Sequence, residues 1–213
     1  MSDPAPPAPT TSPVDPADVP EPTQPQSKAK WALFAVIATV LTVADQVTKV
    51  WVQQNIALYR QEIPVIPGFF SLIHAENTGA AFSFLADFEY RMWVFAAFTV
   101  FAVGMLLQML WQLPNDDRFQ TIALGVVFSG AVGNAIDRAV KQSVTDFAQL
   151  YTEHPGASAF LSSVGIPNPW PSFNVADVAI VVGLGMFLIH WLFLEKDEKD
   201  AKPGTAPSTP AGA

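Results

Sequence analysis

The segment Gly133–Phe147, GNAIDRAVKQSVTDF, joins an apolar stretch to a polar one. It sets four charged or amide side chains at the edge of a run that otherwise has the composition of a membrane span: Asn134, Asp137, Arg138 and Asp146. Charge is costly in hydrocarbon, so ionisable groups within or beside a span usually mark a functional site. We therefore expect the rest of the chain to position this segment.

A second short segment, Phe173–Asp177 (FNVAD), opens the next apolar run. Our interpretation is that Asp146 and Asp177 meet and carry out chemistry. Two close carboxylates share one proton, because both cannot ionise cheaply. The ionised member then deprotonates a water, and the protonated member polarises a carbonyl. Spacing alone leaves an alternative open, in which Asp177 only caps a helix, since a first helical turn favours an anion.

Composition restricts the class of protein. The chain has 213 residues, of which 50% are apolar and 14% charged, against about 25% charged in soluble domains. Such a chain is typical of an integral membrane protein. A net charge of −8 argues against a nucleic-acid partner, which needs a basic face. The absence of Cys and the wide separation of His74, His154 and His190 predict no metal and no cofactor.

Four apolar runs predict membrane-spanning helices, each near the length that about 30 Å of hydrocarbon requires: residues 31–52, 92–111, 119–136 and 175–194. The predicted fold class is a membrane all-α protein with a small β element, namely a bundle of four transmembrane helices with a small sheet lying on the membrane. Small residues at Gly125, Ser129 and Gly133 recur every four positions in the third run. They predict a close approach by a neighbouring helix.

The other segments are predicted from their turn residues and composition. Short β-prone runs at Ile63–Ile66 and Phe69–Ala75 predict two strands that pair as a small sheet, and Pro64 restricts the first to an edge. Asn77-Thr78-Gly79 predicts a tight turn. An extracytoplasmic loop is expected over 140–173. The tails, 1–30 and 195–213, are rich in Pro and Ala and are expected to be disordered, since they cannot bury a core.

The order of four spans puts both tails on one side. The tail side would carry six basic residues and the other side five, a small bias in favour of cytoplasmic tails. With this topology, the ends of the first and third spans and the start of the fourth lie at the same face. Asp45, Arg138 and Asp177 then gather at the outer leaflet, with Asp146 close behind.

Four motifs, in order along the chain, carry a resemblance to a known family. They are DQVTK at 45–49, NTGAAFSF at 77–84, GNAIDR at 133–138 with VTDF at 144–147, and FNVAD at 173–177. Together they resemble the lipoprotein signal peptidases, the type II signal peptidases of bacteria. The resemblance covers roughly residues 44–183. It departs from the family pattern at Ser129-Gly130-Ala131, at Val178, and in the longer connection 149–171.

The resemblance implies an aspartic endopeptidase in the bacterial inner membrane. The family fold that it implies is a bundle of four transmembrane helices with a small extracytoplasmic β-sheet cradle, which we place at residues 56–88. The substrates of this enzyme would be diacylglyceryl-modified prolipoproteins, cut just before the modified Cys, and its other partner would be membrane lipid. The catalytic pair would be Asp146 and Asp177. Further residues would line or support the site: Asp45, Asn77, Gly79, Asn134, Arg138, Asn174 and Ala176. We expect a monomer.

Three other classes of protein are compatible with parts of the sequence. A transporter would also hold charges in the membrane, but it needs polar residues through the middle of its spans, and here the charges gather at one end. A membrane scaffold would use the aspartates only as helix caps. A serine–lysine signal peptidase needs a Ser beside a membrane-embedded Lys, and the sequence offers no plausible pair.

Overall fold

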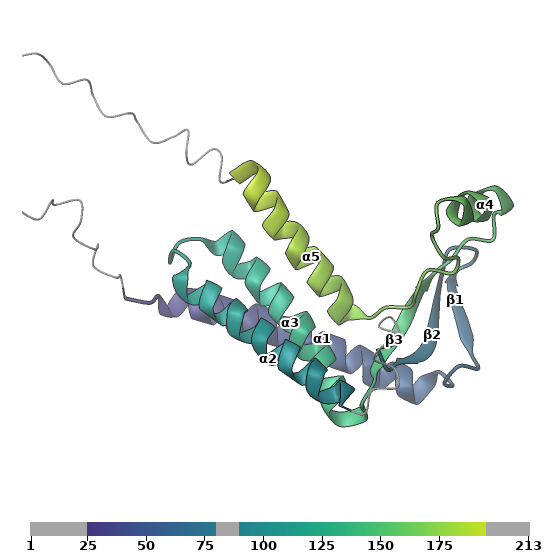
Figure 1. The fold of residues 1–213 in the computed structure, drawn as a ribbon, viewed down its shortest axis with the longest axis horizontal. Coiled ribbons are helices and arrows are strands. Elements are labelled where there is room, and N and C mark those ends of the chain that lie inside the picture. The colour runs from purple at the N-terminus through teal and green to yellow at the C-terminus, as the bar shows by residue number, and fades with distance from the viewer. Residues whose placement is uncertain (1–24, 80–89, 195–213) are drawn as a thin grey trace, which may run out of the picture.

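The computed structural model describes residues 25–79 and 90–194. In this part of the chain, four long helices pack side by side and a small sheet extends beyond one end of them (Figure 1). The spanning helices are α1 (Lys28–Asn55), α2 (Arg91–Gln112), α3 (Arg118–Lys141) and α5 (Val175–Ile189), which a π-helical turn continues over His190–Leu194. All four are long and apolar enough to cross a membrane, so the predicted fold class is confirmed.

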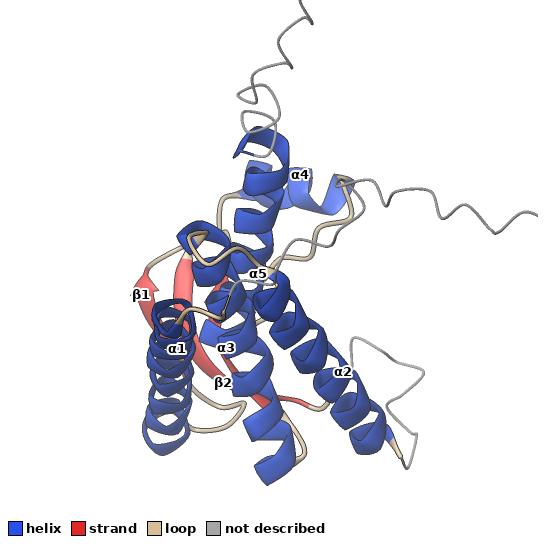
Figure 2. Cartoon of the chain, turned by 90° about the vertical axis from the view of Figure 1, so that its left-hand side faces the viewer, coloured by secondary structure: helices blue, strands red, loops and turns tan. Residues whose placement is uncertain are grey.

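Helix α3 is the centre of the bundle. It has eleven buried residues, whereas α1 has six and α2 has two. It contacts α1, α2 and α5, and Figure 2 shows it between α1 and α2. A Cβ added at Gly125 would lie 3.1 Å from Ile37 of α1, and one at Gly133 would lie 2.5 Å from Asp45 Oδ2. The predicted close approach at the small residues is therefore confirmed, and the neighbour is α1.

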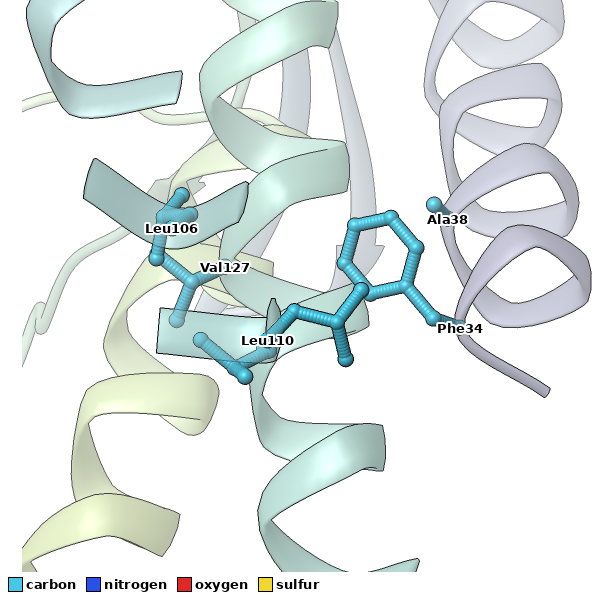
Figure 3. Packing of buried hydrophobic residues seen from close by; sticks show 6 residues of the cluster. Phe34, Ala38, Leu106, Leu110 and Val127 are labelled. Atoms are coloured by element: carbon cyan, nitrogen blue, oxygen red, sulfur yellow. The ribbon is translucent and has the colours of Figure 1, made fainter. Parts of the chain in front are cut away.

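Two apolar clusters hold the elements together. One joins α1, α2 and α3 around Leu110 and Leu124, and in Figure 3 Phe34 of α1 points toward Leu110. The second cluster joins Val52 and Ile56, at the end of α1, to Phe147 and Ala148. The second cluster fixes the sheet to the bundle at the end of α1.

The sheet has three antiparallel strands in the order β1 (Glu62–Ile66), β2 (Phe70–Asn77) and β3 (Val144–Leu150). Strand β1 lies at the edge, which agrees with the prediction from Pro64. Helix α3 ends in a left-handed residue, Gln142, with φ 62°, and the chain enters β3 two residues later. Strand β3 pairs with β2, with Asp146 opposite Ala75.

The predicted extents of several segments need correction. Residues 140–173 are not one loop, because they include β3 and a short helix, α4 (Pro155–Ser163). Strand β3 was missed because both of its faces are buried, so its sequence lacks the alternation that marks a half-buried strand. The third span continues to Lys141 instead of ending at Ile136, since the charges in its last turns find partners inside the protein.

The predicted ends of the first span also change. Helix α1 begins at Lys28 and ends at Asn55, whereas the sequence predicted residues 31–52. The predictions for residues 1–24, 80–88 and 195–213 lie outside the described residues.

Candidate active site

Asp146 lies in the middle of β3, and its side chain is 2% exposed. One carboxylate oxygen, Oδ2, accepts a hydrogen bond from Asn77 Nδ2 at 3.1 Å. The other, Oδ1, accepts from Asn174 Nδ2 at 2.7 Å. Asn77 lies at the end of β2 and Asn174 just before α5, so three separate segments of the chain meet at this carboxylate.

Asp177 lies in the first turn of α5. Its Oδ2 accepts from the backbone N–H of Asn174 at 3.1 Å, and its own N–H donates to Asn174 Oδ1 at 3.0 Å. This reciprocal pair is a capping box, which satisfies N–H groups that the first helical turn leaves free. The remaining oxygen, Oδ1, accepts from Asn134 Nδ2 at 2.8 Å. Asp177 therefore caps α5, as the alternative interpretation of the sequence expected, and it also accepts a hydrogen bond from α3.

Two asparagines join the carboxylates. Asn174 contacts both Asp146 and Asp177. Asn134 donates to Asp177 and accepts from Asn174 Nδ2 at 3.2 Å. The two aspartates, 31 positions apart in the sequence, thus share one amide network at the junction of α3, β3 and α5.

The surroundings of Asp146 disfavour its charged form. Burial raises the pKa of this carboxyl to about 6, and the nearby negative charge of Asp177 raises it as well. The hydrogen bonds from Asn77 and Asn174, and the positive charge of Lys49, act in the opposite direction. Burial has the largest effect, because a carboxylate loses hydration there. Asp146 is therefore the member of the pair that holds a proton more readily than a free aspartate does.

Behind the amide network lies a buried group of charges. Lys49 Nζ contacts Asp45 Oδ2 at 2.9 Å and Asp137 Oδ2 at 3.4 Å, and it donates to Asn134 Oδ1 at 3.0 Å. Lys49 and Asp45 are each 1% exposed. Buried charges need such partners because hydration is lost. Asp45 and Lys49 thus form an ion pair one helical turn apart, and Lys49 also holds the side chain of Asn134.

Asp45 and Asp137 also fix the elements that carry the aspartates. Asp45 Oδ1 accepts from the backbone N–H of Ala176 at 2.9 Å, which ties α1 to the first turn of α5. Asp137 Oδ2 accepts from the backbone N–H of Thr145 at 2.9 Å, which ties α3 to β3. Asp45, Asp137 and Lys49 therefore position Asp146 and Asp177 through the backbone, without contacting either carboxylate.

Asn77 and Gly79 form the predicted tight turn. The Gly79 N–H donates to Asn77 Oδ1 at 2.9 Å, and Gly79 has φ +92°, a conformation that favours glycine. An added Cβ there would lie 2.6 Å from Cζ of Phe95. The Arg138 guanidinium lies over the same ring, 4.8 Å from its centroid. Phe95 of α2 thus links the turn to Arg138.

Arg138 also borders a mostly apolar groove between α2 and α3. The groove has a volume of about 470 Å³ and includes Trp93, Phe95, Ala135 and Ala139 among its walls. The guanidinium supplies its positive charge. Such a groove suits an extended apolar chain with a polar or anionic group near Arg138.

The structure places all nine predicted site residues within one region, in three roles. Asn77, Asn134 and Asn174 contact the carboxylates directly. Asp45 and Ala176 lie behind them, and Gly79 and Arg138 lie beside the site through Phe95.

The set of predicted site residues omitted Lys49, Asp137 and Thr145. The four-residue spacing from Asp45 to Lys49 and from Asp137 to Lys141 was the available signal for the buried charges. Nothing local marked Thr145. Among the described residues, no group of three His, Asp or Glu side chains is arranged to hold a metal ion.

Fold and site together define a multi-pass membrane protein with two carboxylates, one buried and one half-buried, at one end of its helix bundle. Residues 37–193 match the family model described as signal peptidase (SPase) II. The chain is 40% identical over 159 residues to a lipoprotein signal peptidase of Geobacter metallireducens, covering 74% of this chain and 86% of the relative. It is 38% identical over 165 residues to that of Pseudomonas aeruginosa PAO1, covering 76% and 88%.

A solved structure agrees with these relatives. It is described as a bacterial membrane enzyme studied by the in meso method at 1.9 Å resolution, and it superposes with a TM-score of 0.63 at 26% identity. The match covers 76% of this chain and 94% of the solved one. The chain therefore belongs to the signal peptidase II family, as its motifs indicated, and is a membrane peptidase of the bacterial inner membrane.

Proposed function

We propose that the protein is an aspartic endopeptidase that removes signal peptides from prolipoproteins, cutting just before the diacylglyceryl-modified Cys. Asp146 and Asp177 are the catalytic pair of this proposal. The observation that carries it is the shared amide network, in which Asn174 contacts both carboxylates. Family membership supports the substrate class, since relatives in this family are named lipoprotein signal peptidases.

The surroundings of the two carboxylates suggest which one holds the shared proton. Asp146 is the acid in the proposal, because burial raises its pKa to about 6. Asp177 is the base, because it accepts from Asn134 and from the Asn174 backbone at a helix N-terminus, where the dipole stabilises a negative charge.

The proposed reaction uses one water and no other reagent. Asp177 takes a proton from the water, whose oxygen bonds to the scissile carbonyl carbon, while Asp146 gives its proton to the carbonyl oxygen. The resulting diol then returns a proton to Asp146 as its carbonyl re-forms. The peptide C–N bond breaks, and the amine takes the proton held by Asp177. Both carboxyls end as they began.

The location of the pair suits a substrate that arrives through the membrane. A signal peptide is an apolar helix, and the diacylglyceryl group is lipid-soluble, so both substrate halves share the depth of the enzyme. We propose that the groove between α2 and α3 accepts an apolar part of this substrate, with Arg138 orienting a polar group. We further propose cytoplasmic termini, a site near the outer leaflet, and a monomer.

A gel-shift assay with a purified diacylglyceryl prolipoprotein tests the proposal. We expect the parent chain to cut the lipidated substrate and not its unlipidated form. Asp146→Asn or Asp177→Asn should lower the rate by at least about 10²–10⁴-fold, the usual contribution of acid–base catalysis. Asp116→Asn, at an exposed carboxylate between α2 and α3, is the matched control and should cut normally.

Two results would contradict the proposal. Near-normal cleavage by either folded dyad variant would keep the peptidase but reject the catalytic pair. No cleavage by the folded parent chain would favour a scaffold or a transporter.

A further inference from the structure

The segment between β3 and α5 forms a separate cap, which we define as residues 152–170. It contains α4, none of whose residues is buried. The apolar positions Ala157, Phe160, Leu161 and Val164 recur with helical spacing, and Ser158, Ser162 and Ser163 occupy the other side. A nine-residue helix is marginal in water by itself, so the apolar side of α4 needs a covering surface.

Within residues 25–79 and 90–194, the protein supplies only part of that covering. An open cavity of about 360 Å³ lies between the apolar side of α4 and the end of the sheet; its walls include Phe69, Ala157, Phe160, Leu161, Ile166 and Trp170. Three aromatic rings at its rim remain strongly exposed, namely Phe69 at 54%, Phe160 at 64% and Trp170 at 48%. The described residues therefore leave part of the apolar surface of the cap uncovered.

The polar groups around the cavity are already paired with one another. The backbone N–H of Thr152 donates to Asn168 Oδ1 at 2.9 Å, and Asn168 Nδ2 donates back to the Thr152 carbonyl at 2.9 Å. The Tyr151 hydroxyl accepts from the backbone N–H of Gly68 at 3.1 Å. These groups therefore have little capacity left to bind a polar ligand. A partner that covers the cavity must be apolar.

The lack of charged residues in this segment and its position next to α5 indicate which apolar partner covers it. Residues 155–173 contain no Asp, Glu, Lys, Arg or His, which is unusual for a segment surrounded by water. Only residues 171–174 separate Trp170 from the first turn of α5. Val178 and Val181 on that spanning helix are exposed, as expected of a lipid-facing surface. The exposed rings of the cap thus lie close in sequence to an exposed apolar face of a helix that is long and apolar enough to cross a membrane.

We propose that the cap is a membrane-surface anchor, whose apolar face rests in the phospholipid leaflet on the sheet side of the membrane. Figure 1 shows α4 at the end of the sheet that projects away from the helices, where it would extend the contact of the protein with that leaflet. Trp and other aromatic side chains favour this depth of a bilayer. Because residues 155–173 are uncharged, the contact of the apolar face does not depend on anionic lipid. The anchor is independent of the catalytic assignment.

Spin labelling tests the anchor directly, because the chain has no native Cys. The full chain carries one nitroxide, at Phe160→Cys or Trp170→Cys, in phosphatidylcholine vesicles. Ser162→Cys, on the polar side of α4, is the matched control, and Val181→Cys is the lipid-facing reference. We expect the labels at 160 and 170 to be relaxed by oxygen more than by a water-soluble nickel chelate, at an immersion of about 5–10 Å. The label at 162 should show the reverse.

Salt gives a second measurement. The immersion at 160 should not change in about 1 M salt, where the Debye length is about 3 Å. Three results would overturn the anchor: nickel accessibility at 160 and 170 equal to that at 162, protection from both reagents, or immersion that is lost in about 1 M salt. The first result would mean that the cap is surrounded by water. The second would mean that another part of the protein covers it, and the third that the contact with the membrane is electrostatic.

Discussion

The two aspartates are the same residue type in different surroundings. Asp146 is held by side-chain amides on a buried strand, whereas Asp177 is part of a helix cap. In many hydrolases, different surroundings give two paired carboxyl groups different pKa values and different roles. At the residue scale, the proposed roles therefore depend on which hydrogen bonds each carboxylate accepts.

The pH dependence of cleavage tests the proton assigned to Asp146. Above its pKa Asp146 is ionised, and the pair then lacks its acid, so kcat/KM should fall as pH rises through about 6. The hydrogen bond from Asn77 lowers this pKa, so Asn77→Ala should raise it. The alkaline limb of the profile should then move to higher pH in the residual activity.

Thr78→Ala is the control for this experiment, since Thr78 is the exposed neighbour and should leave the profile unchanged. A limb that stays in place or moves to lower pH in Asn77→Ala would show that Asp146 does not supply the proton.

Arg138 is predicted to orient substrate. Its guanidinium lies 4.8 Å from the centroid of Phe95 and borders the groove. Arg138→Ala should lower kcat/KM by at least about tenfold, or about 1.4 kcal/mol of transition-state stabilisation. Arg60→Ala, at an exposed arginine, should have no effect. Equal rates for the two variants would make Arg138 a structural residue only.

At the scale of elements, close helix packing positions the site. Gly130 of α3 lies against the Ala176 carbonyl, and Gly183 of α5 lies against Val127. Small residues at such contacts let two backbones approach. Since α3 carries Asn134 and α5 carries Asp177, the separation of these helices determines the hydrogen bond between the two side chains.

A glycine pair on α5 tests this packing. Gly183→Ala places a methyl group against Val127 and should lower stability by about 1–3 kcal/mol, the usual cost of overpacking. Gly185→Ala meets nothing within 4 Å and should leave the thermal midpoint in detergent unchanged or slightly higher. Equal midpoints for the two variants would show that the α3–α5 contact is looser than the structure indicates.

At the scale of the whole molecule, the beginning of α1 is fixed by contacts with the α2–α3 connection. The Ser27 N–H donates to Asn115 Oδ1 at 2.9 Å, and Lys30 Nζ donates to the Leu113 carbonyl at 2.8 Å. Asn115 Nδ2 in turn donates to the Pro25 carbonyl at 3.0 Å. The end of the bundle opposite the sheet is thus closed by residues 25–30, which the sequence had assigned to a tail.

Two deletions test separately the role of residues 1–24 and the contacts that residues 25–30 make with the α2–α3 connection. Deleting residues 1–24 should leave cleavage and the thermal midpoint unchanged, because the contacts of residues 25–30 remain. Deleting residues 1–30 removes the Ser27 cap and should cost about 0.5–2 kcal/mol, measured as a lower midpoint. Loss of cleavage in the shorter deletion would show that residues 1–24 are needed for function.

Local patterns in the sequence were enough for much of the fold. Run length and composition predicted the four spans, Pro64 predicted an edge strand, and the sequence Asn77-Thr78-Gly79 predicted the turn. Each of these depends on properties of a few neighbouring residues. The motif resemblance also selected site residues that the structure gathers in one region, although their roles remain proposals.

The tertiary structure alone decided how those residues are connected. The pairing of β3 with β2, the contact of Lys49 with Asp137, and the cap depend on segments that are distant in sequence, and local propensity carries no information about them. The same holds for the pKa of Asp146, which burial raises to about 6. The sequence by itself determined a four-span membrane peptidase with two candidate aspartates. The pairing of β2 with β3 and the approach of α5 decided the burial and hydrogen bonds of Asp146, and the packing of α3 against α5 decided the hydrogen bond of Asn134 to Asp177. Only packing removes water from a carboxylate in this way.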